Sequence, residues 1–304
     1  MRRHSAVSSV LGRRALKRVQ TLLIHIYSRN YNMDWKLIDA VAELAVEAGN
    51  AILEIYNSDD LGVSQKADGS PLTAADMAAH RLLVTGLQAL EPDTPVLSEE
   101  SASVEAEVRN LWQRYWLVDP LDGTAEFVNR NGEFTVNVAL IENHRPIMGV
   151  VHAPVQGVTY IGSSALGAYR RDDQGEQAIK ARSVASIVEV NQPLVLMVSR
   201  RHGDTEVTQL VEKINRQLGG CSAKNVGSSL KICRIAEGHA DLYPRLAPTC
   251  EWDTAAAQAV LEAAGGAIVD LDFKVLSYNS KADLLNPFFY AIGDIGFDWP
   301  GLIN

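Results

Sequence analysis

The feature that most restricts the fold of this sequence is an apolar run that ends in two aspartates. Residues 115–118 are followed by Asp119-Pro120-Leu121-Asp122-Gly123-Thr124. The apolar run predicts a buried strand. Because Pro120 cannot donate to a sheet ladder, we expect the strand to end at Asp119 and the backbone to turn there. Such a turn can aim Asp119 and Asp122 at one point.

The two residues after this pair are suited to binding an anion. Gly123 permits backbone angles that are closed to other residues, and the amides from Thr124 onward can open a helix that faces an anion. Carboxylates, a hydroxyl and free amides at a strand end suit a metal-bound phosphate. The motif alone leaves open the alternative of a strand-to-turn corner whose aspartates only cap backbone amides.

Length and composition describe an ordinary globular protein. The 304 residues, 47% hydrophobic and 21% charged, allow one two-lobed unit or two domains. The net charge of −9 argues against nucleic acid as a partner, but a bound cation or a local basic pocket still allows a small anionic substrate. The three cysteines, which include no C-x-x-C pair, favour a reducing compartment, and we expect a cytoplasmic protein without a transmembrane segment.

The segment before residue 34 differs from the rest of the chain. Residues 1–33 contain several arginines and one lysine, and no acidic residue precedes Asp34. This composition fits a transit-type peptide or a helix on a membrane surface, which would place the protein on the cytoplasmic face of the inner membrane. We favour a dispensable tail, because Met33 stands directly before a well-patterned helix and could be the true start.

The first part of the chain reads as α+β. Apolar residues at helical spacing predict helices over residues 34–56 and 73–87, and Thr73-Ala74-Ala75-Asp76 has the spacing of a capping box. Residues 95–98 read as a short strand that delivers Glu99 and Glu100. Further strands are predicted at 134–141, 146–152, 157–161 and 165–169, the first two as a hairpin around residues 142–145.

From about residue 190 the pattern changes to alternating strands and helices, which indicates an α/β lobe. Strands are predicted at residues 194–198, 240–243 and 267–271, and helices at 205–218, 228–237 and 253–264. We therefore divide the chain into a basic extension at 1–33, an α+β metal-binding lobe at 34–190 and an α/β substrate-binding lobe at 191–304.

Four carboxylates end strands or begin helices, namely Glu99, Asp119, Asp122 and Asp253. If they converge, each like-charged pair at 4 Å costs about 4 kcal/mol at an effective dielectric constant near 20, so bound cations would be required. All the ligands would be oxygens, which favours a hard ion such as Mg²⁺ over Zn²⁺. The sequence alone does not establish convergence, and N-capping is the simpler role for Asp253.

Together, these motifs resemble those of the inositol monophosphatase superfamily. The resemblance rests on Glu99-Glu100 after a short strand, Asp119-Pro120-Leu121-Asp122-Gly123-Thr124, and Trp252-Asp253, in this order. It is closer still to the bacterial CysQ-type 3′(2′),5′-bisphosphate nucleotidases and covers roughly residues 34 to 290. The matching segments are Lys66-Ala67-Asp68, residues 71–76, residues 96–100, residues 131–137 and residues 227–231. The resemblance implies a two-lobed sugar-phosphatase-like fold with layers in the order α-β-α-β-α.

The resemblance also implies roles for matching positions. Two or three Mg²⁺ ions would be held by the four carboxylates and the carbonyl of Leu121. Asp76 and Thr124 would orient and deprotonate the attacking water, and Lys66 would lie near the metal ligands. Gly123, Thr124, His202, Ser228, Lys231 and Arg245 would bind the substrate, the last four around its adenosine 5′-phosphate. Ser228 and Lys231 are three residues apart, so we expect them on one turn of the same helix.

The implied reaction is removal of the 3′-phosphate of adenosine 3′,5′-bisphosphate (PAP), giving AMP and phosphate. 3′-Phosphoadenylyl sulfate (PAPS) is a plausible second substrate, and lithium inhibition is expected by analogy. One position departs from the family pattern, because Ala125 follows Asp-Gly-Thr where most CysQ-type sequences have lysine. An inositol phosphatase, a fructose-bisphosphatase-like enzyme and a non-catalytic nucleotide sensor remain as alternatives. The sequence leaves open whether the protein is a monomer or a homodimer.

Overall fold

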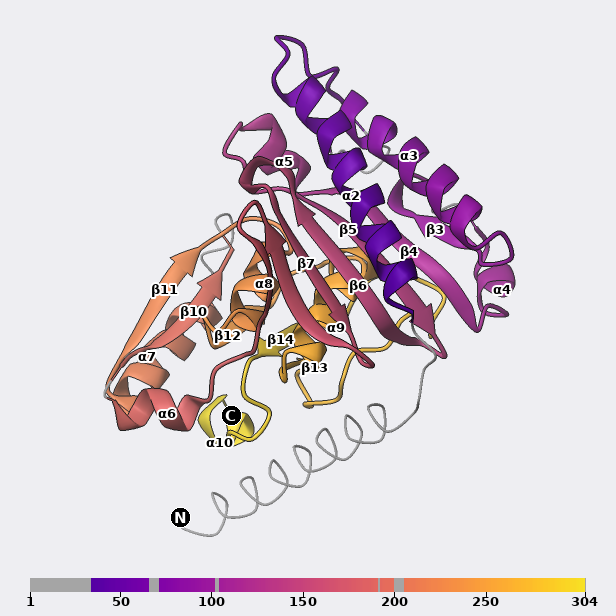
Figure 1. The fold of residues 1–304 in the computed structure, drawn as a ribbon. Helices are drawn as coiled ribbons and strands as arrows, with labels where there is room; N and C mark the ends of the chain where they lie inside the picture. Colours follow the sequence, from indigo (N-terminus) through magenta and orange to yellow (C-terminus); the bar gives the residue numbers. More distant parts are fainter. Residues whose placement is uncertain (1–33, 66–70, 102–103, 191, 200–204, 304) are drawn as a thin grey trace.

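The computed structural model describes residues 34–65, 71–101, 104–190, 192–199 and 205–303 (Figure 1). These residues form two β-sheets with helices between them and on their outer faces, so that the layers follow the order α-β-α-β-α. This confirms the expected α+β fold. The basic segment 1–33 lies outside the described residues. None of the helices in the described ranges is long and apolar enough to cross a membrane.

Two long helices form the first outer layer, α2 (Trp35–Tyr56) and α3 (Ala74–Leu90). Asp34 caps α2 by accepting from the amide of Lys36 at 3.1 Å. Thr73 and Asp76 form the predicted capping box of α3. The helices bury their apolar faces against the first sheet in one hydrophobic cluster, as the helical spacing predicted.

The first sheet has seven strands in sequential order, and its strands are antiparallel except for the parallel pair β3·β4. The strands are β3 (Val96–Ser98), β4 (Arg114–Asp122), β5 (Thr135–Glu142), β6 (Arg145–Ala153), β7 (Val158–Ser163), β8 (Gly167–Asp172) and β9 (Gly175–Ala178). The predicted β5–β6 hairpin is confirmed. Its two turn residues, Asn143 and His144, both have positive φ, which matches the right-handed twist of the strands. The fully exposed β9 was not predicted, because its residues show no apolar alternation.

The end of β4 differs from the prediction that the strand stops at Asp119. Asp119 pairs with Asn137, the register shifts, and Asp122 then pairs with Thr135, so β4 continues through a bulge. Pro120 is accommodated because a bulge removes residues from the ladder and bends the strand locally. Asp119 and Asp122 therefore stand on either side of the same bulge.

The middle layer consists of α8 (Leu230–Ala236) and α9 (Ala255–Ala263), which pack between the two sheets. The alanines of α9 are buried against the first sheet, where small side chains let helix and sheet approach closely. Both helices begin two residues later than predicted. The residues before α9 form a 3-10 turn, η3 (Glu251–Asp253), and Ser228 and Ser229 precede α8.

The second sheet has the strand order β11-β10-β12-β14-β13. Its strands are β10 (Leu194–Val198), β11 (Cys221–Asn225), β12 (Leu242–Arg245), β13 (Ala267–Asp270) and β14 (Phe289–Ile292). β10 pairs in parallel with β11 and β12, whereas β14 is antiparallel to β12 and β13. The predicted strands β10, β12 and β13 are present, and β11 and β14 were not predicted.

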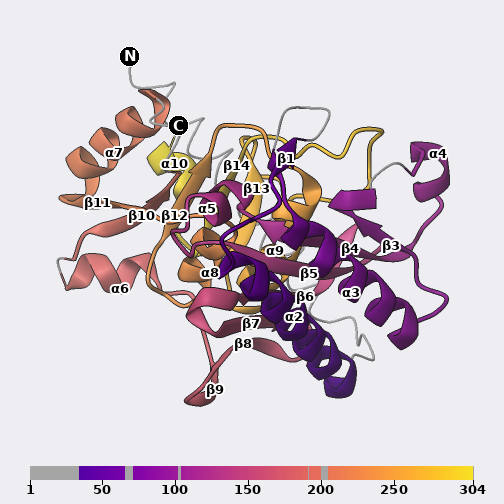
Figure 2. The same cartoon turned by 90° about the horizontal axis from the view of Figure 1, so that it is seen from above.

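The last layer covers the outer face of the second sheet with α6 (Val184–Glu189), α7 (Thr205–Leu218) and α10 (Trp299–Ile303). Figure 2 shows α6 and α7 on the side of the molecule opposite α3, with α8 between α3 and these two helices.

The remaining elements are β1 (Ser64–Gln65), β2 (Pro71–Leu72), η1 (Glu99–Ser101), α4 (Ala106–Arg109), α5 (Thr124–Val128) and η2 (Pro154–Gln156). The bulged end of β4 and the segments that precede α8 and α9 meet at one place.

Candidate active site

Asp119 and Asp122 are fixed by the bulge of β4 in different ways. Asp119 is buried, with 1% of its surface exposed, and its Oδ1 accepts from the amide of Leu121 at 3.0 Å. Asp122 receives its hydrogen bonds at Oδ2. The donors are the amide of Ser229 at 2.6 Å, Nδ2 of Asn137 at 3.3 Å and the hydroxyl of Thr135 at 3.5 Å. The capping role considered for these aspartates is therefore real, but it occupies only part of each carboxylate.

Asp253, at the end of η3, lies close to Asp119 and Asp122 although it is distant from them in sequence. It was expected to open the alanine-rich helix, but it ends the 3-10 turn η3, and α9 begins at Ala255. Its Oδ2 accepts from the amide of Cys250 at 2.8 Å, so it caps the turn rather than the helix. The extra turn was not visible in the sequence because Trp252-Asp253 runs directly into good helix formers.

The structure brings three of the four predicted carboxylates together. Asp119, Asp122 and Asp253 each offer an oxygen, and these oxygens all lie within 4.8 Å of one another. Burial, followed by the charges of Glu99, Asp122 and Asp253, raises the pKa of Asp119 well above its usual value. Burial and the charge of Asp122 raise the pKa of Asp253 to about 8.

Glu99, at the start of η1, lies at the edge of this group. It is not one of the three acids that share the 4.8 Å spacing, but its side chain hydrogen-bonds to that of Asp119. Within the described ranges, no lysine or arginine forms a salt bridge with any of the three aspartates. Buried like charges of this kind are tolerated when a cation neutralises them, and an all-oxygen donor set fits a hard divalent ion.

Gly123 and Thr124 connect the bulge to α5. Gly123 has φ of 90°, a conformation that favours glycine, and it precedes the first residue of the helix. The hydroxyl of Thr124 donates to the carbonyl of Leu121 at 3.4 Å, the carbonyl that the family resemblance assigns to metal binding. α5 therefore does open at Thr124, although it is only 5 residues long.

Asp76 lies at the N-terminus of α3 and is 1% exposed. Its Oδ2 accepts from the amide of Thr73 at 2.7 Å and from the hydroxyl of Thr73 at 2.6 Å. Asp76 thus caps the helix as the spacing predicted. Its role in deprotonating the attacking water stays a prediction.

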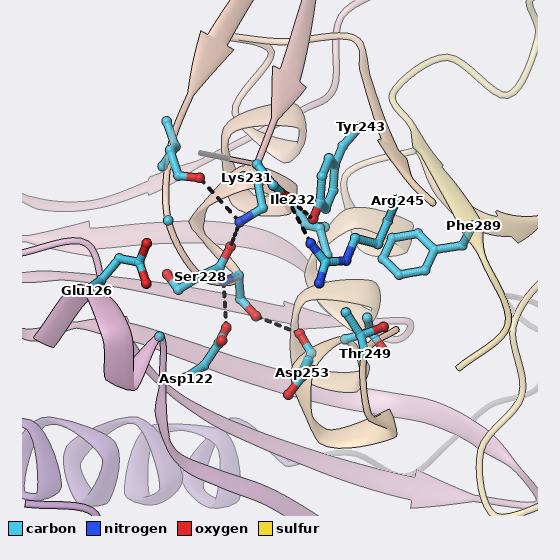
Figure 3. Close-up of a pocket in the computed structure, with 16 residues that line it drawn as sticks. Asp122, Glu126, Ser228, Lys231, Ile232, Tyr243, Arg245, Thr249, Asp253 and Phe289 are labelled. Atoms are coloured by element: carbon cyan, nitrogen blue, oxygen red, sulfur yellow. Dashed lines mark hydrogen bonds between the residues drawn. The ribbon is translucent and has the colours of Figure 1, made fainter. Parts of the chain in front are cut away.

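A cavity of about 190 Å³ opens beside Asp122 and Asp253 (Figure 3). Four of the six residues predicted to bind substrate line it, namely Gly123, Ser228, Lys231 and Arg245, whereas Thr124 does not. The other lining residues are Glu126, Ser199, Val226, Gly227, Ser229, Ile232, Tyr243, Thr249, Thr254 and Phe289. Lys66 and His202 lie outside the described residues.

The two cations of this cavity are held by neutral oxygens. Lys231 is 8% exposed, and its Nζ donates to the carbonyls of Val226 at 3.2 Å and Ser228 at 2.8 Å. The same Nζ lies 5.3 Å from the ring centroid of Tyr243, within the range of a cation–π contact. Arg245 donates from Nη1 to the hydroxyl of Ser199 at 2.9 Å.

Ser228 does not lie on the helix of Lys231, as the three-residue spacing suggested. α8 begins at Leu230 with Ser229 as its N-cap, and Ser228 has φ of 48°, outside the helical region. The two residues still face one cavity, because the carbonyl of Ser228 accepts from Lys231 across the turn. The prediction that they share one helical turn is therefore wrong, although both residues line the same cavity.

Sequence reasoning assigned no role to Asn137, Ser229 or Glu133, although all three contact the segments that form the site. A signal existed for Asn137, because it is a polar residue inside the otherwise apolar strand β5, and it is 1% exposed. A buried amide of this kind needs specific partners. Ser229 offered no such signal, since an N-cap serine is common.

The fold and the site define a class of protein: an α+β layered chain with an acidic cluster that could hold a metal ion beside a cavity lined by cations. The chain belongs to the inositol monophosphatase family, whose model matches residues 34–291. The site assembled above lies wholly within this match.

Individual relatives narrow the comparison. The chain is 48% identical over 254 residues to the 3′(2′),5′-bisphosphate nucleotidase CysQ of Escherichia coli K12, covering 83% of this chain and 98% of the relative. It is 37% identical over 270 residues to the protein of that name from Haemophilus influenzae, covering 88% and 97%. The crystal structure of CysQ from Bacteroides thetaiotaomicron superimposes with a TM-score of 0.74 at 38% identity, covering 84% of this chain and 96% of that chain. An inositol monophosphatase from Anabaena, at 21% identity and a TM-score of 0.65 over 88% and 94% of the two chains, shares the fold.

Proposed function

We propose that this chain is a Mg²⁺-dependent phosphomonoesterase that removes the 3′-phosphate of PAP to give AMP and phosphate, and that it also accepts PAPS. The observation that carries the proposal is the meeting of Asp119, Asp122 and Asp253 beside a cavity that contains Lys231 and Arg245. An acidic cluster and a cationic cavity, side by side, suit a substrate with two anionic groups. The relatives named as 3′(2′),5′-bisphosphate nucleotidases support this reading.

The acids are assigned to metal binding. The three aspartates, Glu99 and the carbonyl of Leu121 would hold two or three Mg²⁺ ions. When bound, Mg²⁺ supplies positive charge to the scissile phosphate and the leaving oxygen and lowers the pKa of water. The raised pKa of Asp119 and of Asp253 supports this assignment, because it shows that their negative charges are poorly compensated by the protein itself.

Asp76 and Thr124 are assigned to the attacking water. Both are oxygen-bearing side chains at helix N-termini, and Asp76 is already ordered by Thr73. We assign Thr124 Oγ1 to accepting a hydrogen bond from the water and Asp76 to receiving the proton. The water oxygen then bonds to phosphorus while the bond to the 3′-oxygen breaks, and the 3′-oxygen takes a proton from solvent to become the 3′-hydroxyl of AMP.

The cavity is assigned to the 5′-phosphate and the nucleoside. Lys231 is more than nine-tenths buried, and none of the described carboxylates forms a salt bridge with it. A buried ammonium held only by carbonyls and a ring attracts an anion strongly. Arg245 can add a bidentate contact to a phosphate, and Ser228 and His202 are assigned to the same group. The net charge of −9 does not oppose this, since the local field is set by these cations.

We further propose that the reaction takes place in the cytoplasm. Cys221 and Cys233 are free thiols in the described structure, which fits a reducing compartment. The membrane-surface alternative depends on residues 1–33.

A substrate panel tests the proposal directly. Phosphate release in Mg²⁺ would be measured for PAP, PAPS, AMP, inositol 1-phosphate and fructose 1,6-bisphosphate, with and without EDTA. We expect kcat/KM for PAP to exceed that for the sugar and inositol phosphates by at least about tenfold, since two charged contacts distinguish it. A preference for an inositol or sugar phosphate would reassign the substrate. Tight binding of PAP without phosphate release would favour a nucleotide sensor.

A further inference from the structure

Ser229 lies between two acids that come from different parts of the chain. It is 2% exposed, its amide donates to Asp122 Oδ2 at 2.6 Å, and its hydroxyl donates to the main-chain carbonyl of Asp253 at 2.7 Å. These bonds appear as dashed lines to Asp122 and Asp253 in Figure 3. Ser229 therefore joins the bulged end of β4 to the end of η3.

Asn137 determines how the hydroxyl of Ser229 is used. Its Nδ2 donates to Ser229 Oγ at 2.9 Å and to Asp122 Oδ2 at 3.3 Å. Because an amide nitrogen can only donate, Ser229 Oγ must accept from it and use its own hydrogen toward Asp253. The network has one consistent assignment, and each member has a separate role.

The segment that carries Ser229 is itself held firmly. Glu133 Oε2 accepts from the amide of Gly227 at 2.8 Å, and Lys231 binds the carbonyls of Val226 and Ser228. A Cβ on Gly227 would lie 2.6 Å from the carbonyl oxygen of Glu133, so this close approach requires glycine. The positive φ of Ser228 persists because these contacts over-determine the backbone.

The network donates its hydrogen bonds to one carboxylate oxygen of Asp122 and leaves the other oxygen available to bind a cation. The hydrogen bonds to Asp122 found among the described residues all reach Oδ2. Oδ1 is therefore the oxygen available to a cation. Meanwhile Asp122 and Asp253 offer oxygens that lie within 4.8 Å of each other, so their like charges repel.

We propose that Ser229 is a positioning residue that holds Asp122 and Asp253 at cation-binding distance before the ion arrives. The inference rests on the proposed metal centre and deepens it. Groups that orient metal ligands typically contribute about 10- to 100-fold to metal affinity. Ser229 acts through its hydroxyl on the carbonyl of Asp253 and through its amide on the carboxylate of Asp122. Asn137 orients the hydroxyl of Ser229 and the carboxylate of Asp122 by donating to each of them.

The test measures Mg²⁺ affinity without substrate, from the rise of the unfolding temperature with Mg²⁺ concentration. Ser229→Ala is compared with Ser229→Thr, which keeps the hydroxyl, and with Ser163→Ala. Ser163 is a matched control, because it is also buried, with 1% of its surface exposed, and its Oγ accepts from the amide of Ala165. It lies at the end of β7, which is three strands away from β4 in the first sheet. Asn137→Leu, nearly equal in volume, tests the same network if Ser229→Ala does not fold.

We expect Ser229→Ala and Asn137→Leu to weaken Mg²⁺ binding by about tenfold or more, Ser229→Thr to restore most of it, and Ser163→Ala to leave it unchanged. In EDTA, the alanine variants of Ser229 and Ser163 should lose similar stability. Unchanged Mg²⁺ affinity in folded Ser229→Ala or Asn137→Leu would overturn the inference while leaving the metal centre intact. A wild-type protein that shows no Mg²⁺-dependent stabilisation would overturn the metal centre itself and, with it, the role of Ser229.

Discussion

The acidic and the cationic halves of the site are built in opposite ways. Asp119, Asp122 and Asp253 are brought together with no salt bridge to a described lysine or arginine, and burial followed by the neighbouring carboxylates raises the pKa of Asp119 and Asp253. Lys231 and Arg245 instead form no salt bridge with the described carboxylates and are held by carbonyl and hydroxyl oxygens. We therefore expect the acidic half to need bound ions and the cationic half to accept an anion.

The two halves should therefore respond to mutation in different ways. Removing an acid relieves strain in the protein without metal but destroys the site. Removing a cation leaves carbonyl groups without a donor and weakens only the recognition of charged substrate.

Asp119→Asn should break the acidic half. We expect Mg²⁺-dependent phosphate release to fall by more than about 100-fold, the upper range for groups that merely surround metal ligands. The unfolding temperature in EDTA should stay the same or rise, because the substitution removes a charge that is costly to bury. Turnover like that of the wild type would remove Asp119 from the mechanism. A large loss of stability in EDTA would show that the acid is structural.

The metal-free protein should also reveal the acidic half through its pH dependence. The carboxyl of Asp253 has a pKa of about 8 in the folded chain against an ordinary 3.8, so the folded state binds more protons between these values. Stability in EDTA should therefore be greatest near pH 4 and fall as the pH rises toward 8, so far as Asp253 determines it. Saturating Mg²⁺ should remove most of that fall. Thermal unfolding across this range, with and without Mg²⁺, measures both slopes. A slope that is identical in the two conditions would contradict the prediction.

The sequence predicted the parts of the fold that depend on local patterns. The helices at 34–56 and 73–87 and the β5–β6 hairpin followed from local periodicity, caps and turns, which each segment carries by itself. The positions of the acids at strand and helix ends raised the possibility that they converge, but only the family resemblance made it an expectation. The structure brings three of the four acids, Asp119, Asp122 and Asp253, within 4.8 Å of one another.

The details that failed depend on partners distant in sequence. Ser228 leaves the helical conformation because the segment around it is held by Glu133 and Lys231, and no local pattern encodes the bond from Gly227 to Glu133. Likewise β4 runs past Pro120 because β5 offers Thr135 as a partner beyond the bulge. β11, with the sequence Cys-Ser-Ala-Lys-Asn, is a strand only because β10 lies beside it. Tertiary pairing overrode local preference in each case.

Arg245→Ala should weaken the cationic half selectively. A hydrogen bond to a charged group contributes about 1.5–3 kcal/mol, so KM for PAP should rise by about 10- to 100-fold with a much smaller change in kcat. A small phosphomonoester without a second phosphate should be nearly unaffected. Steady-state kinetics on both substrates measures the difference.

Two further variants control the Arg245 prediction. Arg245→Lys keeps the charge but loses the bonds to the carbonyls of Ala247 and Pro248, which separates recognition from support of the segment before Asp253. Arg114→Ala removes a surface arginine that pairs with Glu91 and Glu142, and it should leave both KM values unchanged. Equal losses on the two substrates in Arg245→Ala would refute the recognition role.

A smaller change is expected at the border between the halves, where Ala125 stands at the position at which the family resemblance leads us to expect a lysine. Ala125 lies in the first turn of α5, next to Glu126, whose carboxylate is at the cavity (Figure 3). Ala125→Lys should lower KM for PAP by about fivefold at most, because a solvent-exposed charge contributes about 1 kcal/mol or less. The gain should shrink as salt is added, since exposed charges are screened.

Ala125→Gln introduces a long side chain without the charge and should give no such gain. If the two substitutions improve KM equally, packing against the nucleotide rather than charge distinguishes this position. If the gain survives at high salt, the introduced ammonium binds substrate from within the cavity, and the cationic half extends further toward the acids than Lys231 and Arg245 alone define.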